Sequence, residues 1–168
     1  SESLSHVWKA SWISHPTASL LDYGVFLFRR EVHFENVPAQ FKVYVSGDNR
    51  YKLYVNGEYI VSGPARGDQL NWNYETIDIA PFLNKGKNII AAEVVNFGVD
   101  RPLAQHTYQT AFLLQAADNA ADSLNTGSPG WKVTENKAYH PIKIKFETVN
   151  GFYAAGPCDS VRAADYTW

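Results

Sequence analysis

Two alternating segments, YKLYV and EYIVS, flank Asn56-Gly57 and constrain the fold more than any other feature of the sequence. A type I′ turn needs positive φ at both central residues, which Asn and Gly tolerate. The dipeptide therefore predicts a two-residue β-hairpin. Such a turn pairs Val55 with Glu58, Tyr54 with Tyr59, and Leu53 with Ile60. Alternation then places Leu53, Val55 and Ile60 on the core face and the two tyrosines as an aromatic pair on the other face.

Short alternating runs separated by turn residues recur along the whole chain, which is typical of β-structure. Further strands are predicted at 25–34, 41–47, 74–79, 88–96, 111–116, 131–135 and 142–147. A single helical turn is predicted at 80–83, opened by Pro81, with Gly86 permitting its exit. With no long helix and no repeat, the sequence predicts an all-β fold, an antiparallel β-sandwich or jelly roll. We expect the sandwich domain to span 1–150, and 151–168 to form an arm or the start of a linker.

The charge balance argues against two classes of partner. Lys and Arg number 15 and Asp and Glu number 17, with a sequence pI near 6.2. Nucleic-acid binding needs a concentrated cationic face, which this chain lacks, so no nucleic-acid partner is expected. No apolar run approaches the roughly 18 to 20 residues that span a bilayer, so no membrane association is expected. The chain contains no methionine and ends on Tyr-Thr-Trp, so we expect a piece of a longer protein.

No catalytic motif is present. The sequence lacks GxSxG, HExxH, a P-loop and GxGxxG, and its carboxylates are scattered over strands and turns. Cys158 is the single cysteine, so neither an internal disulfide nor a cysteine-based zinc site can form. We expect it to be inert, as most lone cysteines are. No catalytic residue is therefore predicted.

Two loops combine aromatic rings with hydrogen-bonding side chains. Sugar rings stack their C–H faces on aromatic planes, and their hydroxyls bind carboxylates, amides and guanidinium groups. The loops therefore predict carbohydrate-binding residues: Arg66, Asp68, Asn71, Trp72 and Tyr74 in one, and Asp100, Arg101, Gln105 and His106 in the other. The structural alternative is that Trp72 and Trp12 belong to the core or an interface, and that Arg66 and Asp68 pair to hold their loop.

Calcium is the one metal that the sequence leaves open, and no cofactor is otherwise predicted. Asp48-Asn49 and Asp68, with backbone carbonyls, could hold calcium, which accepts mixed oxygen ligands. The same residue types are what turns require, so a purely structural role remains the alternative. The five histidines show no zinc-like spacing.

Three segments in order carry a family likeness: FRREVHF, then FKVYVSGDNRYKLYVNGEYIVSGPARGD, then WNYETIDIAPFLNKGKNIIAAEVVNFG. They resemble the N-terminal β-sandwich domain of bacterial α-L-rhamnosidases of glycoside hydrolase family 78, over roughly residues 8–116. The likeness extends more loosely to galactose-binding-like sandwiches, including those of β-galactosidases and β-glucuronidases. Most shared residues have scaffold roles, so the likeness supports the fold more than the function.

The resemblance implies a non-catalytic accessory domain, because the family's catalytic carboxylates lie in a helical barrel for which this chain is too short. The implied partners are the catalytic domain of the same parent chain and a rhamnose-containing glycan, and the implied location is extracellular or periplasmic. The alternatives are an independent carbohydrate-binding module, the sugar-binding domain of a β-galactosidase-type or β-glucuronidase-type enzyme, and a small enzyme in its own right.

Overall fold

The computed structural model describes residues 8–64, 73–98, 109–142 and 158–166. Nearly all of its regular structure is β-strand. The strands are β1 (Gly24–Phe34), β2 (Lys42–Gly47), β3 (Arg50–Val55), β4 (Glu58–Gly63), β5 (Glu75–Asp78), β6 (Gly86–Asn96), β7 (Phe112–Ala116), β8 (Trp131–Glu135), β9 (Tyr139–Ile142) and β10 (Cys158–Val161). Three short 3₁₀ helices are η1 (Ala80–Phe82), η3 (Asn119–Leu124) and η5 (Ala163–Asp165).

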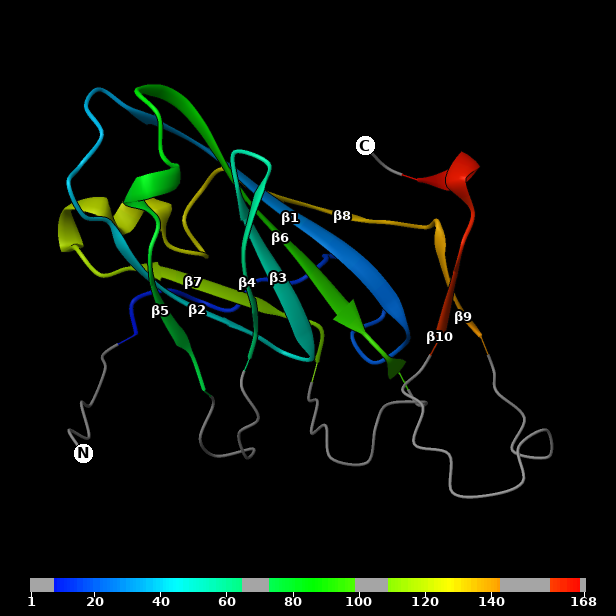
Figure 1. Cartoon of the computed structure of the whole chain (residues 1–168). Helices are drawn as coiled ribbons and strands as arrows, with labels where there is room; N and C mark the ends of the chain where they lie inside the picture. The colour runs from blue at the N-terminus through cyan, green and yellow to red at the C-terminus, as the bar shows by residue number, and fades with distance from the viewer. Residues whose placement is uncertain (1–7, 65–72, 99–108, 143–157, 167–168) are drawn as a thin grey trace, which may run out of the picture.

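The strands form a five-stranded sheet in the order β4-β3-β6-β1-β8 and a three-stranded sheet in the order β5-β2-β7. All recorded strand pairs are antiparallel. A separate two-stranded ribbon, β9 with β10, lies beyond the end of β8 (Figure 1). The predicted all-β antiparallel sandwich is confirmed, and the jelly-roll assignment stays a prediction.

The core lies between the two larger sheets. Alternate residues of β3 and β6 are buried. The fully buried core residues include Phe28 and Leu53 from the five-stranded sheet and Val45 and Leu114 from the three-stranded sheet. Phe112 joins the two layers, because its ring lies 5.5 Å from the ring of Phe28. The period-two burial predicted from the sequence is therefore the pattern that builds this core.

The hairpin forms where Asn56-Gly57 predicts it. Both residues have positive φ, 53° and 85°. Val55 pairs with Glu58, and Tyr54 pairs with Tyr59, whose rings meet edge-on at 5.9 Å. The predicted pairing of Leu53 with Ile60 is wrong: Leu53 pairs with Val61, because the register shifts by one residue next to Tyr54. Such a bulge adds local twist that turn chemistry alone does not reveal.

Asn56 does more than permit the turn. Its amide nitrogen donates to the carbonyl of Phe82 and to Oδ1 of Asn88, both at 2.8 Å, and its Oδ1 accepts from the backbone N–H of Ile89 at 2.9 Å. Asn88 is fully buried and in turn donates to the carbonyls of Asn84 and Gly86. The hairpin tip is therefore tied to the segment between η1 and β6.

Asn56→Gly should retain the turn, because glycine adopts the same positive φ, but should lose all three side-chain hydrogen bonds. At about 0.5–1.5 kcal/mol each, we expect the free energy of unfolding to fall by roughly 2–3 kcal/mol in urea denaturation. Glu58→Ala, at an exposed neighbouring position, is the matched control. A loss of less than about 0.5 kcal/mol for Asn56→Gly would mean that this network contributes nothing net.

The ribbon of β9 and β10 does not coincide with the strand that the sequence predicts. β9 begins at Tyr139, earlier than the strand predicted at 142–147, and most of that predicted segment lies outside the described residues. β10 falls within the segment expected to be an arm, and it pairs with β9 from Cys158↔Ile142 to Val161↔Tyr139. The ribbon is also attached to the sandwich, since the Tyr23 hydroxyl donates to Asp159 at 2.8 Å.

Candidate functional site

One end of the sandwich gathers the strand ends that flank both predicted sugar-binding loops. Register places Gly63 opposite Tyr51, Glu75 opposite Val45, and Phe112 opposite Gly47. The end of β4, the start of β5, the end of β6 and the start of β7 therefore lie beside the turn between β2 and β3 (Figure 1). Of the nine predicted residues, Arg66, Asp68, Asn71, Trp72, Asp100, Arg101, Gln105 and His106 lie outside the described residues, and Tyr74 lies within them.

The turn between β2 and β3 is formed by Asp48 and Asn49, which are 3% and 5% exposed. Asn49 has a φ of 72°, a left-handed conformation that Asn tolerates better than most residues. The Asp48 backbone N–H donates to the carbonyl of Ala111 at 2.9 Å, and its carboxylate accepts from the backbone N–H of Gln109. These bonds fasten the turn to the chain entering β7.

Asn49 presents an unusual side chain. In the part of the chain that the structure describes, neither its Oδ1 nor its Nδ2 has a hydrogen-bond partner, although both are buried. Leaving a buried polar group unsatisfied costs about 1–3 kcal/mol, and native proteins normally satisfy such groups with protein, water or a ligand. An amide that must both donate and accept is chemically matched to a hydroxyl group.

The polar side chains at the end of β6 and just before β7 are hydrogen-bonded. Asn96, at the end of β6, donates to the Leu20 carbonyl at 2.9 Å and to the Thr110 hydroxyl at 2.7 Å, and it accepts from the N–H of Gly98 at 2.8 Å. Thr110 also donates its backbone N–H to Leu20. This network fixes the ends of β6 and β7, so the unsatisfied amide of Asn49 stands in a rigid frame. We call Asp48 and Asn49, with this frame, the Asn49 corner.

Tyr74 belongs to an aromatic cluster on the outer face of the three-stranded sheet. Its ring lies 5.3 Å from Trp8 and 5.6 Å from Tyr44, in both cases nearly perpendicular. Trp8 and Tyr44 are 6.3 Å apart. Because Tyr74 presents a ring to two neighbours, packing accounts for part of its surface, and its predicted contact with sugar stays a prediction. Trp12, the other tryptophan considered as a core residue, is 41% exposed.

A buried phenol links the two sheets at the same end. The Tyr51 hydroxyl donates to the carboxylate of Glu75, which lies against Gly63, where a Cβ would come within 2.8 Å of the carboxylate oxygens. Burial raises the pKa of Tyr51 well above its ordinary value, and the hydrogen bond to the negatively charged Glu75 raises it further. Tyr51 therefore remains a neutral donor, and its hydrogen bond joins β3 of the five-stranded sheet to β5 of the three-stranded sheet.

The described residues contain no group of three or more His, Cys, Asp or Glu side chains that could hold a metal ion. The calcium prediction involved Asp48, Asn49 and Asp68, of which Asp68 lies outside the described residues. Carboxylate and amide oxygens, as at the Asn49 corner, are ligands that calcium accepts. Calcium there stays a prediction. No helix within the described ranges is long and apolar enough to cross a membrane.

From the sequence, Asp48-Asn49 is predicted as a turn or a metal ligand, and Asn49 is not predicted as a carbohydrate-binding residue. Asn and Asp occur in many turns, so the dipeptide carries little information by itself. The distinguishing signal is burial without a hydrogen bond, which depends on contacts far away in the sequence. Trp8 was missed for a similar reason, since nothing local links it to Tyr44 or Tyr74.

Comparison with known proteins shows a shared fold. No family model matches the chain, and no curated protein matches it. Among solved structures, a glycoside hydrolase family 78 rhamnosidase of Bacillus sp. GL1 aligns over 80% of this chain with a TM-score of 0.70 and 24% identity. The α-L-rhamnosidase from Dictyoglumus thermophilum aligns over 79% with a TM-score of 0.58 and 23% identity.

The chain spans 14% and 18% of the lengths of those two structures. It therefore has the fold of one part of each. The predicted resemblance to a β-sandwich domain of family 78 rhamnosidases is confirmed at the level of the fold.

Proposed function

We propose that this chain is a non-catalytic, carbohydrate-binding β-sandwich domain of a larger α-L-rhamnosidase-like glycoside hydrolase. Its fold is that of a small part of such enzymes, which favours a domain of a longer protein over an independent module. The proposed partners are the catalytic domain of the same chain and a glycan containing rhamnose. We place the parent enzyme outside the cytoplasm, where polysaccharides are usually broken down.

The observation that carries the binding proposal is the buried, unsatisfied amide of Asn49. A sugar hydroxyl both donates and accepts a hydrogen bond, so a single hydroxyl or a vicinal pair satisfies both atoms of the amide. The neighbouring carboxylate of Asp48 already accepts the Gln109 N–H, which orients it within the same corner. The framework of Asn96 and Thr110 is formed without ligand, which lowers the cost of ordering the site on binding.

Calorimetric titration with L-rhamnose and with D-galactose, each with and without calcium, tests this proposal. We expect Asn49→Gly to weaken binding at least about tenfold, since loss of one or two hydrogen bonds to ligand costs roughly 1.4 kcal/mol or more. Glycine keeps the left-handed backbone, so the variant removes the amide and leaves the turn. Thr134→Ala, on an exposed position of β8, is the control.

Two results would overturn parts of the proposal. Unchanged affinity in Asn49→Gly would exclude the corner as the site. No heat with either sugar at millimolar concentration would exclude the binding role and leave a domain that supports the catalytic domain. The chain should also fail to hydrolyse an aryl α-L-rhamnoside, and turnover that survives repurification would contradict the non-catalytic assignment.

A further inference from the structure

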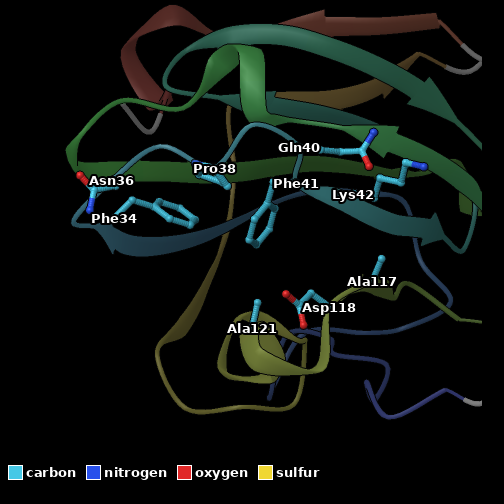
Figure 2. Close-up of a pocket in the computed structure, with 9 residues that line it drawn as sticks. All are labelled: Phe34, Asn36, Pro38, Gln40, Phe41, Lys42, Ala117, Asp118 and Ala121. Atoms are coloured by element: carbon cyan, nitrogen blue, oxygen red, sulfur yellow. The ribbon is translucent and has the colours of Figure 1, made fainter.

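A pocket of about 510 Å³ lies where β1 ends and β2 begins (Figure 2). Its residues come from the end of β1 through the start of β2 on one side and from the segment running from β7 into η3 on the other. The two sides are joined by a hydrogen bond from the N–H of Ala117 to the carbonyl of Lys42 at 2.9 Å. The pocket lies where β1 and β7 end, whereas the Asn49 corner lies near where they begin. The two sites are therefore separate.

One wall of the pocket is aromatic. The rings of Phe34 and Phe41 meet edge-to-face at 5.3 Å and 84°, and Pro38 extends the same apolar wall. Both rings are half-buried. The backbone of Phe41 is held on both sides, because its N–H donates to Asp78 at 2.8 Å and its carbonyl accepts from Ile79 at 2.9 Å. This wall therefore exists before any ligand arrives.

The facing wall consists of small side chains and one carboxylate. Figure 2 shows Ala121 across the gap from Phe41, with the carboxylate of Asp118 beside Ala121. Lys42 and Asn36 stand at the margin. Because one lysine and one aspartate carry opposite charges, the lining has no net charge, which favours a neutral ligand over an ion.

These features define the ligand class. The volume lies within the roughly 300–1,000 Å³ range of small-molecule sites, which combine apolar walls with a few polar groups. A neutral molecule with an apolar face and several hydroxyls fits an aromatic wall that faces a carboxylate. We infer that the Phe34–Phe41 pocket, defined by Phe34, Pro38, Phe41, Asp118 and Ala121, is a second carbohydrate site that takes one sugar ring. The inference shares the ligand class of the proposed function but does not depend on the Asn49 corner.

Filling the pocket tests this inference. Ala121→Leu adds side-chain volume to the facing wall, and Asp118→Ala removes the carboxylate. Ala163→Leu is the matched control, since it makes the same change at an exposed position of the 3₁₀ helix η5. Binding is followed by ¹H–¹⁵N NMR titration with L-rhamnose and D-galactose, reading the backbone amides of Asn36, Ala117 and Ala121 for the pocket and those of Asn49 and Gly98 for the corner.

We expect saturable shifts at the pocket amides in the original chain and in Asn49→Gly. Affinity at these amides should fall at least about tenfold in Ala121→Leu and in Asp118→Ala, and should be unchanged in Ala163→Leu. Absent pocket shifts, or pocket affinity unaffected by both pocket variants, would overturn the inference. Corner shifts that persist in that case leave the proposed function standing. Conversely, pocket shifts without corner shifts would contradict the proposed corner and support the pocket.

Discussion

Phe112→Ala should lower the free energy of unfolding by about 3–5 kcal/mol, the cost typical of removing a buried aromatic ring from a core. Phe112 is fully buried, and its ring also lies 6.2 Å from Tyr51 and 5.7 Å from Trp131. The neighbouring rings of Phe28, Tyr51 and Trp131 belong to β1, β3 and β8 of the five-stranded sheet, whereas Phe112 belongs to β7 of the other sheet. The cavity left by the substitution therefore cannot close by movement of one strand. A loss of this size is a large part of the roughly 5–15 kcal/mol that stabilises a typical domain.

Urea denaturation followed by tryptophan fluorescence measures this loss. Leu21→Ala, at a residue that is 65% exposed, should change stability by no more than about 0.5 kcal/mol and serves as the control. A loss below about 1 kcal/mol in Phe112→Ala would show that the two sheets do not depend on this ring for their contact.

Alkaline pH should destabilise the protein through Tyr51. The pKa of Tyr51 is raised in the folded state by burial and by the Glu75 carboxylate, so the folded protein keeps this proton above pH 10 while the unfolded chain loses it. The stabilisation is fully present below pH 10 and decreases as the pH rises above it. Tyr51 alone should contribute a loss of about 1.4 kcal/mol per pH unit between pH 10 and the folded-state pKa.

Other tyrosines also destabilise the folded protein at alkaline pH. The test therefore compares the pH dependence of stability in Tyr51→Phe with that in the original chain. Burial and a hydrogen bond with Tyr166 raise the pKa of Tyr139 to about 12, and burial with the Asp159 contact raises the pKa of Tyr23. At pH 7, the free energy of unfolding of Tyr51→Phe should be about 1–3 kcal/mol lower than that of the original chain. Above pH 10, the stability of the variant should fall less steeply with pH than that of the original chain. Tyr59→Phe, which removes an exposed hydroxyl, is the control. Parallel pH profiles for Tyr51→Phe and the original chain would contradict the assignment.

Much of the fold was predictable because its signals are local. Asn56-Gly57 sets the hairpin and its first two residue pairs, and alternation in β2 and β3 identifies the buried face. Local signals failed where geometry depends on distant neighbours. The bulge next to Tyr54 shifts Leu53 onto Val61, and the ribbon of β9 and β10 joins segments that carry no shared pattern.

The candidate sites were also predicted only where the signal is local in the sequence. Loop composition led to the prediction of sugar-binding residues in two loops, and of these Tyr74 lies within the described residues, where it packs against Trp8 and Tyr44. Asn49 was predicted only as a turn or metal residue, because nothing local distinguishes a solvated turn from a buried one. The pocket between Phe41 and Asp118 was not predicted at all, since its two walls are brought together by the pairing of β2 with β7.

The sequence by itself determined the all-β class, the hairpin at Asn56-Gly57 and the buried faces of β2 and β3, since turn stereochemistry and alternation are properties of adjacent residues. Tertiary structure alone decided which polar groups lose water. It placed Asn49 in a buried corner with its amide unsatisfied, Tyr51 against Glu75, and Phe41 opposite Asp118. Desolvation depends on everything that surrounds a group, and most of those surroundings come from segments distant in the chain.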